Sequence, residues 1–121
     1  MPARRILVVD DDDVLRGSLV EQLSLYEEFD IAEDATAAKG VHRARQEPLD
    51  LVIMDVGLPD MDGREAVKLL RQQGFKNPII MLTGHDSEAD TIDGLEAGAN
   101  DYVTRPFRCS VLLARMRVHL L

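Results

Sequence analysis

Short runs of apolar residues, each closed by polar or turn residues, recur along the chain. One of them, Leu51-Val52-Ile53-Met54, leads straight into Asp55. A continuous apolar run bounded by turn residues predicts a strand that is buried on both faces, as in the interior of a parallel sheet. These runs and one alternating segment predict strands at residues 6–9, 29–32, 50–54, 79–82 and 101–104.

Between the predicted strands, apolar residues recur at the spacing of an amphipathic helix. Leu15, Leu19 and Leu23 lie four residues apart and form the apolar stripe of the first helix. The residues expected to face inward in the fourth helix are Ala89, Ile92 and Leu95. The predicted helices are residues 13–26, 36–46 and 87–96, one between Gly63 and Gly74, and one that carries Leu113, Met116 and Leu120.

Strand and helix therefore alternate five times along one domain, residues 1–121, with no linker dividing it. This alternation predicts an α/β fold with a parallel sheet and helices on both faces, the doubly wound, flavodoxin-like class. Right-handed crossovers leave few topologies, and the common order for five strands is 2-1-3-4-5. The first and third strands are then neighbours, and a ligand cleft opens at their carboxyl ends.

That strand order gathers polar residues at one edge of the sheet. Asp10 and Asp11 follow the first strand, and Asp55 ends the third. Three carboxylates at one edge repel each other, which raises a pKa or favours uptake of a cation. Oxygen ligands alone suit Mg²⁺. The fourth and fifth strands end at the same edge, with the hydroxyl of Thr83 and the guanidinium of Arg105.

Acids, a metal ion, a hydroxyl and a guanidinium together suit a phosphoryl group. The metal ion and the cation neutralise its oxygens, the hydroxyl donates to one of them, and a carboxylate is the nucleophile. Asp55 is best placed as the nucleophile, because the third strand lies between the strand that leads to the metal-binding acids Asp10 and Asp11 and the strands that lead to Thr83 and Arg105. Each residue alone has an ordinary structural explanation as a cap, a turn or a surface residue, so the prediction depends on their joint occurrence.

Composition and charge limit the kinds of partner that the chain can bind. The 121 residues carry a net charge of −8, which argues against binding nucleic acid without a further, basic domain. No apolar run approaches the roughly 20 residues that span a bilayer, so no membrane partner is expected. The single cysteine, Cys109, excludes an internal disulfide and favours a reducing, cytoplasmic compartment.

From about Arg4 to Leu121 the chain resembles a response-regulator receiver domain of the CheY-like kind, the phosphoacceptor half of two-component signalling. The motifs that carry the resemblance are Ile6-Leu7-Val8-Val9-Asp10-Asp11, Leu51-Val52-Ile53-Met54-Asp55 with Leu58-Pro59-Asp60-Met61-Asp62-Gly63, Met81-Leu82-Thr83-Gly84, and Gly98 through Phe107. The resemblance implies that Asp55 is the phosphorylated aspartate. It also implies Mg²⁺ binding by Asp10, Asp11, Asp55 and the backbone carbonyl of Gly57.

The resemblance further implies partners and a switch. Thr83 and Tyr102 match the pair that moves when the phosphoryl group arrives, and the expected donor is a sensor histidine kinase or a phosphotransfer protein. The stretch Asn100–Phe107 is similar to receivers that precede winged-helix DNA-binding domains, which typically dimerise through the fourth helix, fifth strand and fifth helix. Asp101 and Arg115 fit that pattern. We expect a C-terminal output domain that is missing from this chain, with DNA bound only through it, and a stand-alone receiver is the alternative.

Two other functions remain open at this point. Receivers carry Lys where this chain has Arg105, which leaves the alternative of a degenerate receiver that binds a partner without being phosphorylated. The guanidinium is a planar fork that can either clamp Asp55 or swing out of the cleft. A phosphatase that uses an aspartyl-phosphate needs a second acid two residues after the nucleophile, where Gly57 stands. We therefore expect a phosphoacceptor switch and no enzyme beyond self-catalysed phosphorylation and dephosphorylation.

Overall fold

The computed structural model describes residues 2–84 and 88–121, with the backbone only for residues 83 and 88–90. Helices and strands alternate as the hydrophobic pattern predicts. The strands are β1 (Arg4–Val9), β2 (Phe29–Asp34), β3 (Leu51–Asp55), β4 (Ile79–Thr83) and β5 (Asp101–Thr104). The helices are α1 (Asp13–Ser24), α2 (Ala37–Gln46), α3 (Gly63–Gln72), α4 (Glu88–Ala97) and α5 (Cys109–His119).

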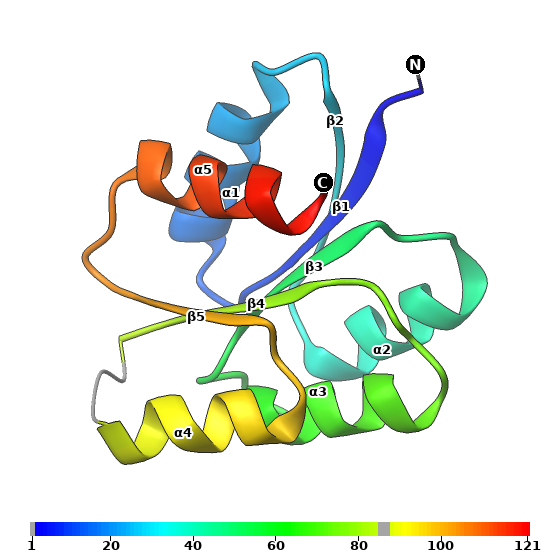
Figure 1. Cartoon of the computed structure of the whole chain (residues 1–121), viewed down its shortest axis with the longest axis vertical. Coiled ribbons are helices and arrows are strands. Elements are labelled where there is room, and N and C mark those ends of the chain that lie inside the picture. The colour runs from blue at the N-terminus through cyan, green and yellow to red at the C-terminus, as the bar shows by residue number, and fades with distance from the viewer. Residues whose placement is uncertain (1, 85–87) are drawn as a thin grey trace.

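All four strand pairings are parallel, and the strand order is β2-β1-β3-β4-β5, which confirms the predicted fold class. Figure 1 shows the sheet between two layers of helices, with α1 and α5 on one face and α2, α3 and α4 on the other. No helix in the described ranges is long and apolar enough to cross a bilayer.

Both faces of the central strands are buried, which explains their continuous apolar runs. In β3, Val52 and Met54 belong to the core beneath α2, α3 and α4. Leu51 and Ile53 point to the opposite core beneath α1 and α5. Because successive side chains of a strand alternate between faces, one run fills both cores and cannot shift by a residue without moving every side chain to the other face.

The predicted apolar stripe of α4 is wrong. Ile92 and Leu95 are 45% and 44% exposed, and among residues 91–97, the part of this helix whose side chains the structure describes, Gly94 and Ala97 are buried. The ring of Tyr102 occupies the space between helix and sheet, since a Cβ at Gly94 would lie 2.7 Å from its Cδ2 atom. The helix therefore packs through its smallest residues. Ala89, the third residue predicted to face inward, has its side chain outside the described part of the structure.

Details of the first helix and of the edge strand also differ from the sequence prediction. The first helix ends at Ser24, two residues before the predicted end. Its Leu15 is 45% exposed although it belongs to the apolar stripe. The edge strand β2 continues to Asp34, because it pairs with β1 as far as Val9, and Val9 reaches the edge of the acidic cleft.

A close approach of two backbones fixes the segment after β3. The N–H of Gly63 donates to the carbonyl of Val56 at 2.9 Å, and Gly57 forms an antiparallel bridge with Asp62. A Cβ at Gly63 would lie 2.8 Å from the carbonyl carbon of Asp55 and 2.9 Å from the Cα of Val56. Glycine at this position therefore lets α3 begin directly beside the end of β3.

This contact predicts opposite effects for two glycine substitutions in helices. Gly63→Ala should lower the free energy of unfolding by roughly 3 kcal/mol, since two backbones would have to separate. Gly17→Ala, at an exposed helical position with nothing within 4 Å of the added carbon, should raise it by up to about 1 kcal/mol. Chemical denaturation followed by circular dichroism measures both. Equal effects of the two substitutions would contradict the close approach at Gly63.

Candidate functional site

Three carboxylates meet where β1 and β3 end. Val9 pairs with Met54 in the sheet, so the next residues, Asp10 and Asp55, lie side by side. Asp10 and Asp55 are buried, 3% and 6% exposed, and Asp11 is exposed. One oxygen from each of these acids lies within 4.8 Å of the other two. The structure thus brings together the acids that the sequence analysis assigned to a metal ion.

The environment of Asp55 disfavours its charged form. Burial is the largest cause that raises the pKa of its carboxyl, and the neighbouring charge of Asp10 raises it further. The charge of Arg105 and the backbone N–H of Val56 act in the opposite direction without cancelling the rise. A cation beside this carboxylate would therefore be stabilised more strongly than a cation beside an exposed carboxylate.

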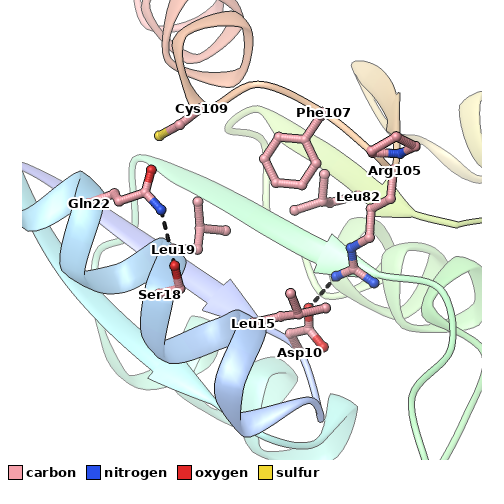
Figure 2. A pocket seen from close by; sticks show the side chains of 10 residues that line it. Asp10, Leu15, Ser18, Leu19, Gln22, Leu82, Arg105, Phe107 and Cys109 are labelled. Atoms are coloured by element: carbon pink, nitrogen blue, oxygen red, sulfur yellow. Dashed lines mark hydrogen bonds and ion pairs between the residues drawn. The ribbon is translucent and has the colours of Figure 1, made fainter.

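Arg105 reaches Asp10 from the loop that follows β5 (Figure 2). Its Nη2 forms a hydrogen-bonded ion pair with Oδ2 of Asp10, and its Nη1 lies 3.7 Å from Oδ1 of Asp55. The guanidinium neither clamps Asp55 alone nor swings out of the cleft. It lies across both buried acids, and its closer partner is Asp10.

A second arginine, which the sequence analysis missed, fixes the loop of acids after β1. Arg16 donates from Nη1 to the backbone carbonyl of Asp10 at 2.6 Å and from Nη2 to Asp13 at 2.7 Å. Its Nε donates to Glu33 on β2 at 2.9 Å. The i,i+3 spacing from Asp13 signals only one of these contacts. The other two depend on where β1 and β2 lie in three dimensions.

The remaining site residues lie around the acids. Thr83 ends β4 and pairs with Thr104 of β5, but its side chain lies outside the described part of the structure. Tyr102 is half-buried and packs against the core beneath α3 and α4. Gly57 is exposed in the turn after β3, and a Cβ there would lie 4.0 Å from Oδ2 of Asp55.

A cavity of about 510 Å³ opens beside the acids, between α1 and the loop from β5 to α5. Figure 2 shows the paired Asp10 and Arg105 at one end and Cys109 at the other. The walls are mainly apolar and include Leu15, Leu19, Leu82 and Phe107. Exposed Leu15, which did not fit the predicted stripe, is thus part of the cavity wall.

The face formed by α4, β5 and α5 combines a charge network with exposed apolar residues. Arg115 pairs with Asp101 at 2.9 Å, and Nε2 of His119 lies 3.1 Å from the same carboxylate. Burial acts to raise the pKa of Asp101, but hydrogen bonds from His119, the N–H of Tyr102 and Arg115 outweigh it and leave the pKa lowered. The exposed apolar residues on these helices are Ile92, Leu95, Val111 and Val118.

The donor set fits a hard divalent cation. Asp10, Asp11 and Asp55 offer only carboxylate oxygens, and two of the three groups are buried where an uncompensated negative charge is unfavourable. Mg²⁺ takes oxygen ligands, uses few carboxylates and keeps several waters, so a cluster with one exposed side suits it.

The chain belongs to the family of response regulator receiver domains, whose sequence model matches residues 6–117. It is 44% identical to the response regulator MprA of Mycobacterium sp. (strain KMS), covering 99% of this chain and 51% of MprA. It is 41% identical to the alkaline phosphatase synthesis transcriptional regulatory protein SphR of Synechococcus elongatus, covering 98% and 49%. The chain thus spans about half the length of these curated relatives.

Solved structures agree with this assignment. The BeF3-activated N-terminal receiver domain of Klebsiella pneumoniae RstA superposes with a TM-score of 0.90 at 33% identity, covering 97% of this chain and 98% of that one. A CheY-like receiver domain from Methanospirillum hungatei gives 0.90 at 31% identity, covering 98% and 94%. The chain is a receiver domain homologous to transcriptional regulators of two-component systems. The comparisons give no support to the degenerate alternative.

The raised pKa of Asp55 predicts how the metal-free protein responds to pH. Between the ordinary aspartate pKa and the raised one, the folded state holds a proton that the unfolded state has lost, so stability falls as pH rises through this window. At neutral pH, Asp55→Asn should therefore raise the melting temperature in the presence of a chelator. The difference should shrink below the ordinary aspartate pKa, where both states are protonated.

Thermal unfolding across a series of pH values measures this effect. Asp11→Asn is the matched control, because it removes one charge from the same cluster at an exposed position. Its melting temperature should rise less than that of Asp55→Asn. An Asp55→Asn protein that melts at or below the parent's temperature at neutral pH would contradict the assigned environment of Asp55.

Proposed function

We propose that Asp55 accepts a phosphoryl group from the phosphohistidine of a sensor histidine kinase or phosphotransfer protein. The observation that supports this most is the position of Asp55, which is buried, ends a central strand, lies beside two further acids and has a guanidinium 3.7 Å away. A carboxylate oxygen of Asp55 forms the new bond to phosphorus while the phosphorus–nitrogen bond of the donor breaks. The imidazole leaves neutral after it takes up a proton.

The other residues of the site would support this transfer. Asp10, Asp11 and Asp55, with the backbone carbonyl of Gly57, would hold Mg²⁺, which neutralises the oxygens of the phosphoryl group. Arg105, whose Nη1 lies 3.7 Å from Asp55, would add a second positive charge beside the phosphoryl group. In the same arrangement a water molecule would later attack the phosphorus while the bond from phosphorus to the Asp55 oxygen breaks. Inorganic phosphate, which keeps the protons of the water or passes one to solvent, then leaves, and the carboxylate is restored.

The output would pass through Thr83 and Tyr102 to α4, β5 and α5. Phosphorylation of Asp55 would draw Thr83 inward and open space for the Tyr102 ring, which biases an existing two-state equilibrium. The exposed apolar residues Ile92, Leu95 and Val111 support a homodimer through this face. A C-terminal output domain would bind DNA, in keeping with relatives of about twice this length, and we place the protein in the cytoplasm.

Phosphorylation by a small donor tests the proposed acceptor. With acetyl phosphate and Mg²⁺, the intact mass of the protein should rise by one phosphoryl group, and Asp55→Asn should abolish the gain. Asp11→Asn should need at least about tenfold more Mg²⁺ for half-maximal labelling, or about 1.4 kcal/mol of lost binding. Glu27→Gln removes one exposed charge elsewhere and should behave as the parent. Labelling of Asp55→Asn to the parent's level would rule out Asp55 as the acceptor.

A phosphoryl analogue tests the proposed output face. Adding beryllofluoride with Mg²⁺ should shift backbone amide resonances over residues 83–107 and produce a dimer in sedimentation experiments, because the analogue favours the active state. Shifts confined to the acids after β1 and β3, with no change in mass, would mean that no switch operates through α4, β5 and α5.

A further inference from the structure

Both oxygens of the buried Asp10 carboxylate are already bound within the chain. Oδ1 accepts the backbone N–H of Asp12 at 3.0 Å, and Oδ2 accepts the guanidinium of Arg105. The same guanidinium lies 3.7 Å from Asp55. Hydrogen bonds between charged groups are shorter and stronger than those between neutral groups. Arg105 is therefore placed where it balances two buried negative charges at once.

We propose that the positive charge of Arg105 takes the place of a divalent cation beside Asp10 and Asp55 when no metal ion is bound. Mg²⁺ then has to displace the guanidinium from Asp10 in order to bind. The inference rests on the proposed function, because the displaced contact belongs to a proposed metal ligand. Two cations in contact with one buried carboxylate repel each other strongly where water is scarce. Binding of the metal and the contact between Arg105 and Asp10 therefore exclude each other.

The structure offers room for the displaced side chain. Arg105 is 24% exposed and lines the cavity of about 510 Å³ together with Phe107 and Cys109, which follow it in the same loop (Figure 2). A guanidinium that leaves Asp10 can turn into the mouth of this cavity. The loop between β5 and α5 then responds to the metal ion before any phosphoryl group arrives.

Arginine suits this role better than lysine would. The guanidinium has a planar fork of donors, so one side chain reaches Asp10 through Nη2 and faces Asp55 through Nη1. A lysine ammonium is a compact point charge on a flexible stem, and it competes for one carboxylate at a time. The competition against Mg²⁺ should therefore weaken from Arg to Lys and vanish when the charge is removed.

The order of affinities is tested directly by titrating each protein with Mg²⁺ and monitoring the amide resonances of the segments that carry Asp10, Asp11 and Asp55. Arg105→Met keeps an unbranched stem without charge and should bind Mg²⁺ about tenfold more tightly than the parent, and Arg105→Lys about threefold more tightly. Arg108→Met is the matched control. It removes an exposed charge from the same loop, at a residue whose side chain makes no capping bond to α5, and should stay within about twofold of the parent.

Simple charge repulsion gives a different order. It predicts equal affinities for the parent and Arg105→Lys, with only Arg105→Met tighter, and this result would overturn the proposal, as would equal affinity in all variants. Mg²⁺ that binds equally to all of them leaves the proposed metal site intact and removes only the role of Arg105. Failure of every variant to bind would remove both.

Two further measurements do not depend on Arg105→Met folding. In the parent, the Nε–Hε resonance of Arg105 and the amides of Phe107 and Cys109 should shift in step with Mg²⁺ binding; unchanged signals would contradict displacement. In phosphorylation by acetyl phosphate, Arg105→Lys should lower the Mg²⁺ concentration for half-maximal rate. A change in the maximal rate alone would contradict competition for the metal site.

Discussion

The site is shaped by one physical constraint, which is that two negatively charged carboxylates lie side by side where little water reaches them. Asp10 and Asp55 end neighbouring strands that are buried on both faces, so the sheet that stabilises the fold also forces the two carboxylates together. Their repulsion needs a positive charge nearby. Arg105 supplies it in the metal-free protein, and the same requirement is what would draw in a divalent cation and a phosphoryl group.

The parts of the fold that could be predicted are those whose physical cause leaves a pattern in the sequence. Burial on both faces requires an unbroken apolar run, so the run Leu51–Met54 was sufficient to predict β3 and to place Asp55 at its end. Alternation of strand and helix with right-handed crossovers left one common strand order, which brought Asp10 beside Asp55. The acid cluster therefore follows from local patterns and one topological rule.

Other features depend on how side chains share space, and the sequence carries little trace of them. Ile92 and Leu95 have helical spacing but are exposed, because the Tyr102 ring lies directly against Gly94 and α4 packs on the sheet through Gly94 and Ala97. The contact of Arg105 with Asp10 joins residues 95 positions apart. It depends on the path of the loop after β5 and on side-chain conformation, and the sequence alone left open whether Arg105 clamps Asp55 or swings out of the cleft.

The proposed switch depends above all on Asp55 as the residue that carries the phosphoryl group. Borohydride reduces an aspartyl phosphate to homoserine, so treatment of the phosphorylated protein followed by peptide mass spectrometry locates the modified residue. We expect homoserine at position 55, formed only when Mg²⁺ and a phosphoryl donor are both present. Homoserine in place of Asp10, Asp11 or another acid, or none at all in a protein that has gained a phosphoryl group, would contradict this assignment.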